Sequence, residues 1–225
     1  MITDLYDREY ACPVCDHVFS TKKVRRSAIR LESRESDFKP NYSGENPLHY
    51  MVCVCPNCGY SSLESEFNNI EKSSITNVRM KIRSNWIKRS FGDVRDTDIA
   101  IETYKLALVS GQASSLKFSM MGLISLRLAW LYRDKNSDEE LRYLSLAKVY
   151  YEKAYNEEYL DDNPDNEIQI LFSLGEINRR LGYYNDAIKW FSKTLEHKDI
   201  KKKRHIELKA RDQWSEAKRE YTLSK

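Results

Sequence analysis

Cys12-Pro13-Val14-Cys15 and Cys55-Pro56-Asn57-Cys58-Gly59 are the two stretches that decide how the N-terminal part of this chain folds. Each stretch places two residues between its two cysteines, so that both sulfurs of a pair can face one metal ion. Four thiolates complete the tetrahedral shell of a structural Zn2+ site and leave no open position for a substrate. The sequence therefore predicts one structural zinc ion held by Cys12, Cys15, Cys55 and Cys58.

Two other chemistries use the same residue type. A redox dithiol needs only one Cys-x-x-Cys pair, usually at a helix start after a strand. Tetrathiolate iron is chemically feasible, because soft thiolates suit iron as well as zinc. The presence of two pairs, each with proline after its first cysteine, favours zinc over both alternatives.

Three further residues lie close enough in sequence to enter such a site. Cys53 lies between Val52 and Val54 on a β-prone segment, and we expect it to be a half-buried apolar residue. His17 and His49 could each replace a ligand. A complete set of four cysteines makes that unnecessary, so we expect both to be surface or hydrogen-bonded histidines.

The 39 residues between the two pairs exceed the roughly 15–20 of a simple ribbon, so this segment must hold structure of its own. Val24–Leu31 is predicted to be a strand, and the polar stretch Glu32–Asn46 is predicted to be a loop. Tyr50–Val54 is β-prone and leads directly into the second pair. We therefore expect residues 1–70 to form a zinc-ribbon-like module, a small antiparallel sheet that carries two knuckles.

A basic run follows the first cysteine pair, and it has two interpretations. It could contact nucleic-acid phosphates, or it could be a solvated strand face balanced by Glu32, Glu35 and Asp37. The net charge of only +3 and the lack of a recognition helix or stacking aromatics favour the solvated face. The basic residues are Lys22, Lys23, Arg25, Arg26, Arg30 and Arg34.

Several short motifs, spread over most of the chain, are specific when taken together. They are Cys12-Pro13-Val14-Cys15, Phe19, Val24-Arg25, Arg34-Glu35-Ser36-Asp37-Phe38, Asn46-Pro47-Leu48, Tyr50, Val54-Cys55-Pro56-Asn57-Cys58-Gly59-Tyr60 and Leu128-Ala129-Trp130-Leu131-Tyr132-Arg133. With these motifs the chain resembles an uncharacterised bacterial family, domain of unknown function 2225. The resemblance implies a cytoplasmic bacterial protein with a zinc-knuckle start, a tetratricopeptide-like end and no known reaction. Relatives often have cysteine after the Asp-Phe pair, where this chain has Lys39.

Residues 71–225 show a pattern of small, aromatic and small residues at helical spacing, typical of the second helix of tetratricopeptide repeats. The segment Ser73–Ile87 is predicted to be a connecting helix with a basic outer face, and Asp161–Pro164 to separate two repeats. His205–Tyr221 is predicted to cap the stack, with Ile206, Leu208, Trp214 and Ala217 facing inward. The pattern of small, aromatic and small residues occurs three times, at Ala100, Tyr104 and Ala107; at Ala147, Tyr151 and Ala154; and at Ala187, Phe191 and Thr194.

The first helices of such repeats line a concave groove, which predicts a set of partner-binding residues. An aromatic residue flanked by arginines suits an acidic or C-terminal peptide. The alternative is that the aromatic residues simply pack within the helical stack. The second basic run, Lys201–Arg204, is either a solvated loop or a patch for phosphate or acidic partners. The predicted partner-binding residues are Trp130, Arg133, Phe172, Arg179 and Arg180.

The chain shows no glycine-rich phosphate loop, no His-Glu-x-x-His motif and no nucleophile elbow, so we expect no enzymatic activity. Its first residues show no basic region followed by an apolar core, so we expect no signal peptide. Its most apolar stretch, Met120–Tyr132, is interrupted by Arg127 and too short for a bilayer. The sequence thus predicts a mainly α, cytoplasmic, zinc-binding scaffold that binds a protein or peptide, with no membrane and no small-molecule substrate. The alternatives are a nucleic-acid-associated zinc ribbon acting through residues 22–34 and, less favoured, a thiol redox protein.

Overall fold

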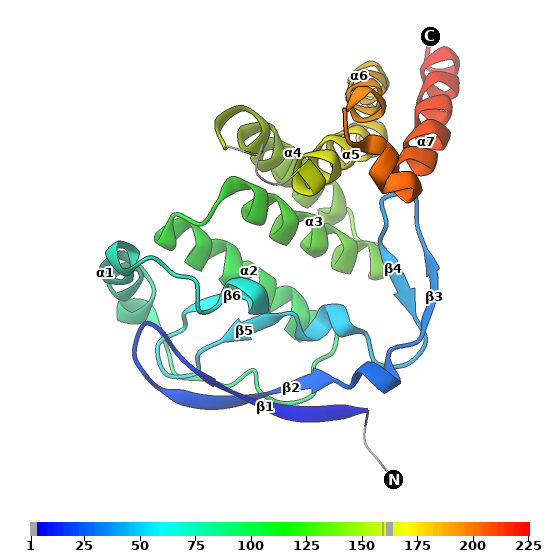
Figure 1. Ribbon diagram of the computed structural model, residues 1–225. Helices are drawn as coiled ribbons and strands as arrows, with labels where there is room; N and C mark the ends of the chain where they lie inside the picture. Colours follow the sequence, from blue (N-terminus) through cyan, green and yellow to red (C-terminus); the bar gives the residue numbers. More distant parts are fainter. Residues whose placement is uncertain (1–3, 159, 161–163) are drawn as a thin grey trace. The chain divides into compact units, whose positions relative to one another are not determined.

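The computed structural model describes residues 4–158, 160 and 164–225, and it is mainly helical with a small N-terminal β region (Figure 1). The chain divides into two compact units. Unit 1 comprises the described residues up to Ser33, Pro40–Leu116 and Arg127–Glu140. Unit 2 comprises Arg34–Lys39, Lys117–Leu126 and the described residues from Leu141 to Lys225. The predicted separator at Asp161–Asn163 lies outside the described residues.

Short strands come first in the chain, and α-helices make up most of the remainder. The strands are β1 (Leu5–Ala11), β2 (Val18–Val24), β3 (Leu31–Arg34), β4 (Pro40–Tyr42), β5 (Val52–Val54) and β6 (Ser61–Leu63). The helices are α1 (Lys72–Lys81), α2 (Thr97–Ser114), α3 (Phe118–Asp134), α4 (Glu139–Glu157), α5 (Pro164–Arg180), α6 (Tyr184–Glu196) and α7 (Arg204–Leu223).

The strands form three separate two-stranded sheets, β1–β2, β3–β4 and β5–β6. Strand β1 pairs with β2 in antiparallel register, with Ala11 opposite Val18 at the turn. Strand β5 pairs with β6 in the same way, with Val54 opposite Ser61. Each of these hairpins therefore carries one Cys-x-x-Cys turn at its tip, in place of the single predicted sheet.

Two segment predictions between the cysteine pairs are wrong. The predicted strand at Val24–Leu31 is a short 3-10 turn at Arg26–Ala28 flanked by the end of β2 and the start of β3. The predicted loop at Glu32–Asn46 contains the β3–β4 hairpin. Its polar composition hid the pairing, because a two-stranded ribbon without a buried face needs no alternation of apolar residues.

Helices α1 and α2 belong to unit 1, because α2 packs on β5 and β6 and α1 packs on α2. The hydroxyl of Tyr104 donates to the carbonyl of Leu48 (3.1 Å), and the amide of Ser61 donates to the hydroxyl of Ser110 (3.1 Å). The structure therefore divides differently from the predicted boundary at residue 70. The predicted connecting helix also ends earlier, at Lys81.

The small and aromatic residues of the repeat pattern are buried in α2, α4 and α6, as predicted. In unit 2, the reason for the pattern is visible in two helix pairs. A Cβ atom at Gly122 of α3 would lie 2.6 Å from the ring of Tyr151 in α4. A Cβ atom at Gly175 of α5 would lie 2.6 Å from the ring of Phe191 in α6. Glycine thus lets each aromatic ring pack directly on the neighbouring helix.

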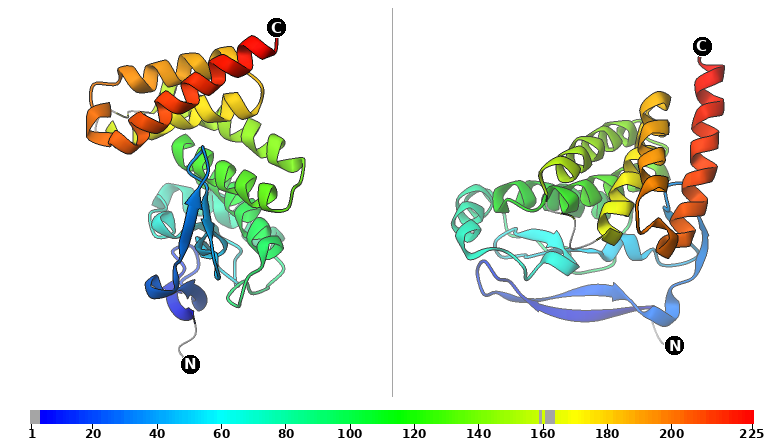
Figure 2. Two further views of the ribbon diagram at one scale, coloured as in Figure 1. Left: turned by 90° about the vertical axis from the view of Figure 1, so that its right-hand side faces the viewer. Right: turned by 45° about the horizontal axis from the view of Figure 1, so that its top comes forward.

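Helix α7 packs on α5 and α6, and Figure 2 shows α6 and α7 side by side. Ile206 and Ala217 are buried, as predicted for a helix that covers the end of a stack. Leu208 is 49% exposed, so its predicted inward position is wrong. Among the helices of the described residues, none combines the length and the apolar composition needed to cross a membrane.

Candidate metal centre

The two Cys-x-x-Cys turns have the same backbone geometry. In the first turn, the amide of Cys12 donates to the carbonyl of His17 (3.0 Å), and the amide of Asp16 donates to the carbonyl of Cys12 (2.8 Å). In the second turn, the amide of Gly59 donates to the carbonyl of Cys55 (2.9 Å). Asp16 (φ 59°) and Gly59 (φ 76°) are left-handed at equivalent positions. Glycine adopts this region readily, and aspartate tolerates it better than most other residues.

The four sulfur atoms converge on one point, as the spacing predicted. They all lie within 4.8 Å of one another. The Sγ atoms of Cys12 and Cys58 are 3.6 Å apart, and those of Cys15 and Cys55 are 3.7 Å apart. A tetrahedral ion with metal–sulfur bonds of about 2.3 Å separates its sulfurs by about 3.8 Å, whereas a disulfide brings them to about 2.05 Å. The cluster therefore fits a tetrahedrally bound metal ion and not a disulfide.

The cluster lies in the core of unit 1. Cys12, Cys55 and Cys58 are buried together with Tyr60 and Phe67. Hydrogen bonds from the thiols of Cys12 and Cys58 lower the pKa of Cys55 to about 2 when no metal is bound. Hydrogen bonds of Cys12 to Cys55 and Cys58, together with burial, raise the pKa of the Cys12 thiol. A cation that enters the cluster must displace such protons, so its affinity falls as the pH is lowered.

Two side chains from the segment after β6 hold the backbone of the two turns. The guanidinium of Arg79 in α1 donates to the carbonyl of Val14 from Nε (3.0 Å) and Nη2 (2.7 Å). The indole of Trp86 donates to the carbonyl of Pro56 (2.9 Å). Arg79 was predicted to lie on a solvent-facing basic surface, and no local sequence signal marks either contact. Such neighbours fix the positions of metal ligands.

We expect Arg79→Ala to loosen the metal centre, because the carbonyl of Val14 loses both of its donors. Outer residues of this kind typically change metal affinity by roughly 10–100-fold. The change would be read from the rate at which a chelator removes the metal. Arg83→Ala, an exposed arginine just after the same helix, serves as the control and should leave that rate unchanged. Equal rates for the two variants would exclude a role for Arg79.

Gly59 is required at the second turn for two reasons. Its φ is positive, and a Cβ atom would lie 2.5 Å from ring carbons of Trp86. We expect Gly59→Ala to displace the indole and to lower the thermal stability of unit 1 together with its metal retention. Gly44→Ala is a matched control, because Gly44 has φ +89° but no atom within 4 Å of the added Cβ. The control measures the backbone strain alone, which costs about 1–2 kcal/mol. If Gly59→Ala lost no more stability than Gly44→Ala, the packing argument would be contradicted.

The other candidate ligands lie outside the cluster. Cys53 is fully buried in β5, not half-buried as predicted, and burial raises the pKa of its thiol. His17 is exposed. The ring of His49 contacts the carbonyl of Arg95 (3.2 Å) and the hydroxyl of Thr97 (3.4 Å). Both histidines thus agree with the prediction that each is a surface or hydrogen-bonded residue.

The first half of the basic run is engaged inside unit 1. Lys22 forms an ion pair with Asp7 (2.8 Å) and Lys23 with Glu64 (2.7 Å). Lys23 is buried, and its ammonium group also donates to the carbonyl of Tyr50 (2.5 Å). The two lysines do not use the predicted acidic partners, which are Glu32, Glu35 and Asp37. Three other arginines of the run are exposed, namely Arg26, Arg30 and Arg34.

The five predicted partner-binding residues belong to different units. In unit 1, Trp130 is 8% exposed, and Arg133 donates from Nε to Glu140 (2.7 Å). In unit 2, Phe172 is 1% exposed, and its ring lies 5.8 Å from that of Phe191. The interpretation that the aromatic residues pack within the helical stack therefore agrees with their burial. Binding of a partner by these residues stays a prediction.

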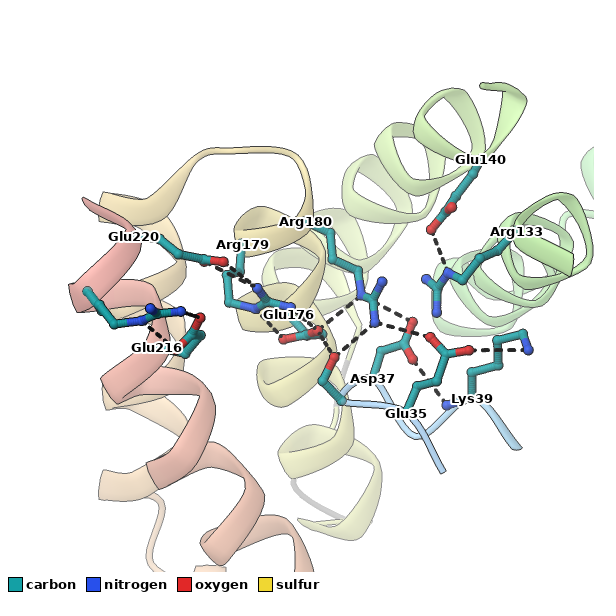
Figure 3. A network of polar contacts seen from close by, with 12 residues as sticks. Glu35, Asp37, Lys39, Arg133, Glu140, Glu176, Arg179, Arg180, Glu216 and Glu220 are labelled. Carbon is teal, nitrogen blue, oxygen red and sulfur yellow. Dashed lines mark hydrogen bonds and ion pairs between the residues drawn. The ribbon is translucent and has the colours of Figure 1, made fainter. Parts of the chain in front are cut away.

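Arg179 and Arg180 of α5 converge on one buried carboxylate (Figure 3). The side chain of Glu176 is fully buried and accepts from Arg179 at Nε (3.0 Å) and Nη2 (2.8 Å). It also accepts from Arg180 at Nε (3.0 Å). Arg179 reaches Glu220 of α7 as well (2.9 Å). The hydrogen bonds that Arg179 donates to Glu176 raise the pKa of Arg179, so this arginine stays charged.

The second basic run pairs with nearby acids in unit 2. The exposed ammonium groups of Lys201 and Lys202 form ion pairs with Glu207 (2.7 Å) and Asp199 (2.5 Å). Both lysines are more than two-thirds exposed, which agrees with the solvated interpretation of this segment.

Comparison with known proteins places the chain in a family but gives it no activity. The chain is 25% identical to an uncharacterized protein of Borreliella burgdorferi over 227 residues, which cover 88% of this chain and 80% of that protein. No solved structure matches it. The model of the family described as "Uncharacterized protein conserved in bacteria (DUF2225)" matches residues 5–217, so the chain belongs to this family.

Proposed function

We propose that this protein is a cytoplasmic, non-enzymatic interaction protein in which a structural zinc ion folds the cysteine-rich part and the helical part binds a peptide or protein. The observation that carries the proposal is the closed cluster of four sulfurs. Its four thiolates would fill the coordination shell of one metal ion, and three of the four cysteines are buried. Such a shell has no position for a bound water, so the metal acts on folding and not on a substrate.

Zinc is the metal that this donor set fits best. Four thiolates in a tetrahedral arrangement are typical of structural zinc. The filled d shell of Zn2+ gives it no preference for a different coordination geometry. The strands around the cluster are short, with β5 and β6 only three residues each. Zinc binding supplies about 10–16 kcal/mol in small zinc-folded peptides, enough to order segments of this size.

The helical part supports the interaction role. Successive helices pack through the small and aromatic residues that are typical of tetratricopeptide repeats. Repeats of this kind stack into extended surfaces that bind other chains. On α5, Arg179 and Arg180 follow the aromatic Phe172 by about two helical turns, and this combination of groups suits an acidic peptide segment.

The experiment that tests this proposal joins metal analysis to partner capture. The protein is purified from its native host with an affinity tag, and half of the eluate is treated with nuclease. We expect one zinc per chain and one protein enriched regardless of the nuclease. Recovery of partners that depends on nucleic acid would favour the basic run of residues 22–34 as the binding element. Absence of zinc together with reactive thiols would favour redox chemistry.

A further inference from the structure

The α5 face of unit 2 holds a turn from a distant part of the chain. Residues Arg34–Lys39 lead from β3 to β4 and belong to unit 2, although Ser36 of this turn and Glu176 of α5 are 140 positions apart in the sequence. The sequence of the turn is Arg-Glu-Ser-Asp-Phe-Lys. It thus combines two acidic residues with an aromatic one, the chemistry expected of a peptide partner for this face.

Arg180 is the centre of the polar contacts with the turn, as Figure 3 shows. Its Nη2 atom donates to the hydroxyl of Ser36 (2.9 Å) and lies 3.5 Å from a carboxylate oxygen of Glu35. Its Nε atom lies 3.5 Å from a carboxylate oxygen of Asp37. The hydroxyl of Ser36 also donates to Glu176 (2.5 Å). One arginine therefore binds a hydroxyl and two carboxylates of the same turn.

The aromatic residue of the turn fills the apolar side of the same face. The ring of Phe38 lies 4.8 Å from that of Phe172 and 5.9 Å from that of His205. Phe38 has φ 64°, a left-handed conformation that is strained for a bulky side chain. Such strain persists only where the surroundings hold the residue in place. The packing on Phe172 thus stabilises an otherwise unfavourable backbone.

The turn also holds its own shape. The amide of Glu35 donates to the carbonyl of Lys39 (2.9 Å), and the amide of Phe38 donates to the carbonyl of Glu35 (3.1 Å). The amide of Lys39 donates to the carboxylate of Asp37 (3.1 Å). The recognised shape is therefore encoded within five residues, so a different chain can present it too.

We propose that the surface formed by Phe172, Glu176, Arg179 and Arg180 of α5 and by His205 of α7, called the α5 surface below, is a binding site for an acidic–aromatic turn of a partner protein. The partner's turn takes the place of Glu35–Phe38. Such a turn has two acidic residues separated by one residue, followed directly by an aromatic residue. This inference rests on the proposed interaction function and names its site and its class of partner. The chain's own turn is then an internal competitor that keeps the surface covered until a partner replaces it.

The chain's own turn, Arg34–Lys39, competes with any free peptide for the α5 surface and so lowers the apparent affinity of that peptide. A segment tethered to its own site acts at an effective concentration in the millimolar range. A free peptide with the same contacts therefore competes poorly in the wild-type chain. Weakening the internal turn removes this competition, because the surface on α5 is itself unchanged.

The test uses the full-length, metal-loaded chain and a fluorescent peptide of residues 31–42. Affinity is measured by fluorescence anisotropy for the wild type and for the double variant Asp37→Asn, Phe38→Ala. We expect the double variant to bind at least about 10-fold more tightly than the wild type. Adding Arg180→Gln to the double variant should abolish binding. A peptide with alanine in place of Phe38, equal in charge, is the control and should not bind.

A double variant that keeps its native circular dichroism and its metal but does not bind the peptide would overturn the proposal. If that variant does not fold, nuclear magnetic resonance of the wild type tests whether the peptide can replace the chain's own turn. With the peptide in the millimolar range, wild-type amide signals of α5 and α7 must shift if the surface exchanges its occupant, and constant signals would overturn the proposal. Dimers of the wild type that exchange their turns would also overturn it, in favour of a second copy as the occupant.

The proposed α5 surface and the proposed interaction function can fail independently of each other. A partner captured from the host whose binding is unaffected by Arg180→Gln would remove the α5 surface and leave the interaction role standing. A chain that binds the peptide but captures no host protein would support the surface and count against the wider role.

Discussion

Replacing Cys58 with serine should release the metal and lower the free energy of unfolding of unit 1 by several kcal/mol. Cys58 is fully buried, and its sulfur contacts that of Cys12 at 3.6 Å. A serine hydroxyl is not ionised at neutral pH, so the variant offers only three thiolates. The binding free energy at stake is about 10–16 kcal/mol for a complete structural zinc site. The effect should reach α1 and α2, because both helices belong to the same unit.

Cys53→Ala is the matched control for this variant. Cys53 lies two residues before the second cysteine pair and is equally buried, but it is not among the four converging sulfurs. We expect the control to keep one zinc per chain and to lose about 1 kcal/mol from the smaller side chain. Metal per chain is measured by plasma mass spectrometry, and unfolding by thermal circular dichroism. A Cys58→Ser protein with the zinc content of the wild type would contradict the assignment.

Glu176→Ala should destabilise unit 2 by about 3–5 kcal/mol, the usual cost of leaving buried charges without their partner. Glu176 is fully buried and accepts hydrogen bonds from Arg179, Arg180 and Ser36. Its removal leaves two arginines side by side with one fewer carboxylate between them. We therefore expect mutual repulsion in addition to lost hydrogen bonds.

The control for this prediction is Glu216→Gln in α7. Glu216 forms an ion pair with the exposed side chain of Arg219, and exposed ion pairs contribute little to stability. The urea midpoint of unit 2 should fall for Glu176→Ala and stay at the wild-type value for Glu216→Gln. Equal midpoints for both variants would show that the buried network does not hold the helices together.

The metal cluster and the buried helix stripes were predictable because their geometry is local. Two residues between cysteines fix the direction of both sulfurs, whatever the surroundings. A helical period of 3.6 residues likewise brings Ala147, Tyr151 and Ala154 onto one face. In both cases the pattern lies within a single element, and the structure confirms it.

Contacts between distant segments were not predictable from these patterns. Arg95 is 3% exposed and donates to the carbonyls of His49 and Val52 and to the hydroxyl of Thr21. Nothing in its neighbouring sequence marks it as different from an exposed arginine. Arg79 on the carbonyl of Val14 is a second such contact.

The turn at Arg34–Lys39 shows the same limit more clearly. Its charges were assigned to the neighbouring basic run, because partners close in sequence are the simplest choice. The structure pairs Glu35 and Asp37 with Arg180 instead, and this pairing depends on how β3 and β4 form a hairpin. A polar two-stranded hairpin leaves no hydrophobic pattern, so the sequence could not indicate the contact.

Native mass spectrometry of the full-length protein, purified without chelators or reducing agents, tests the central claim most directly. The account predicts a single species whose mass exceeds that of the chain by one zinc ion. It also predicts that acidification releases the zinc, because the thiolates regain their protons. A metal-free species with all five cysteines reduced, a disulfide-bonded species or a chain loaded with iron would each contradict the structural zinc site.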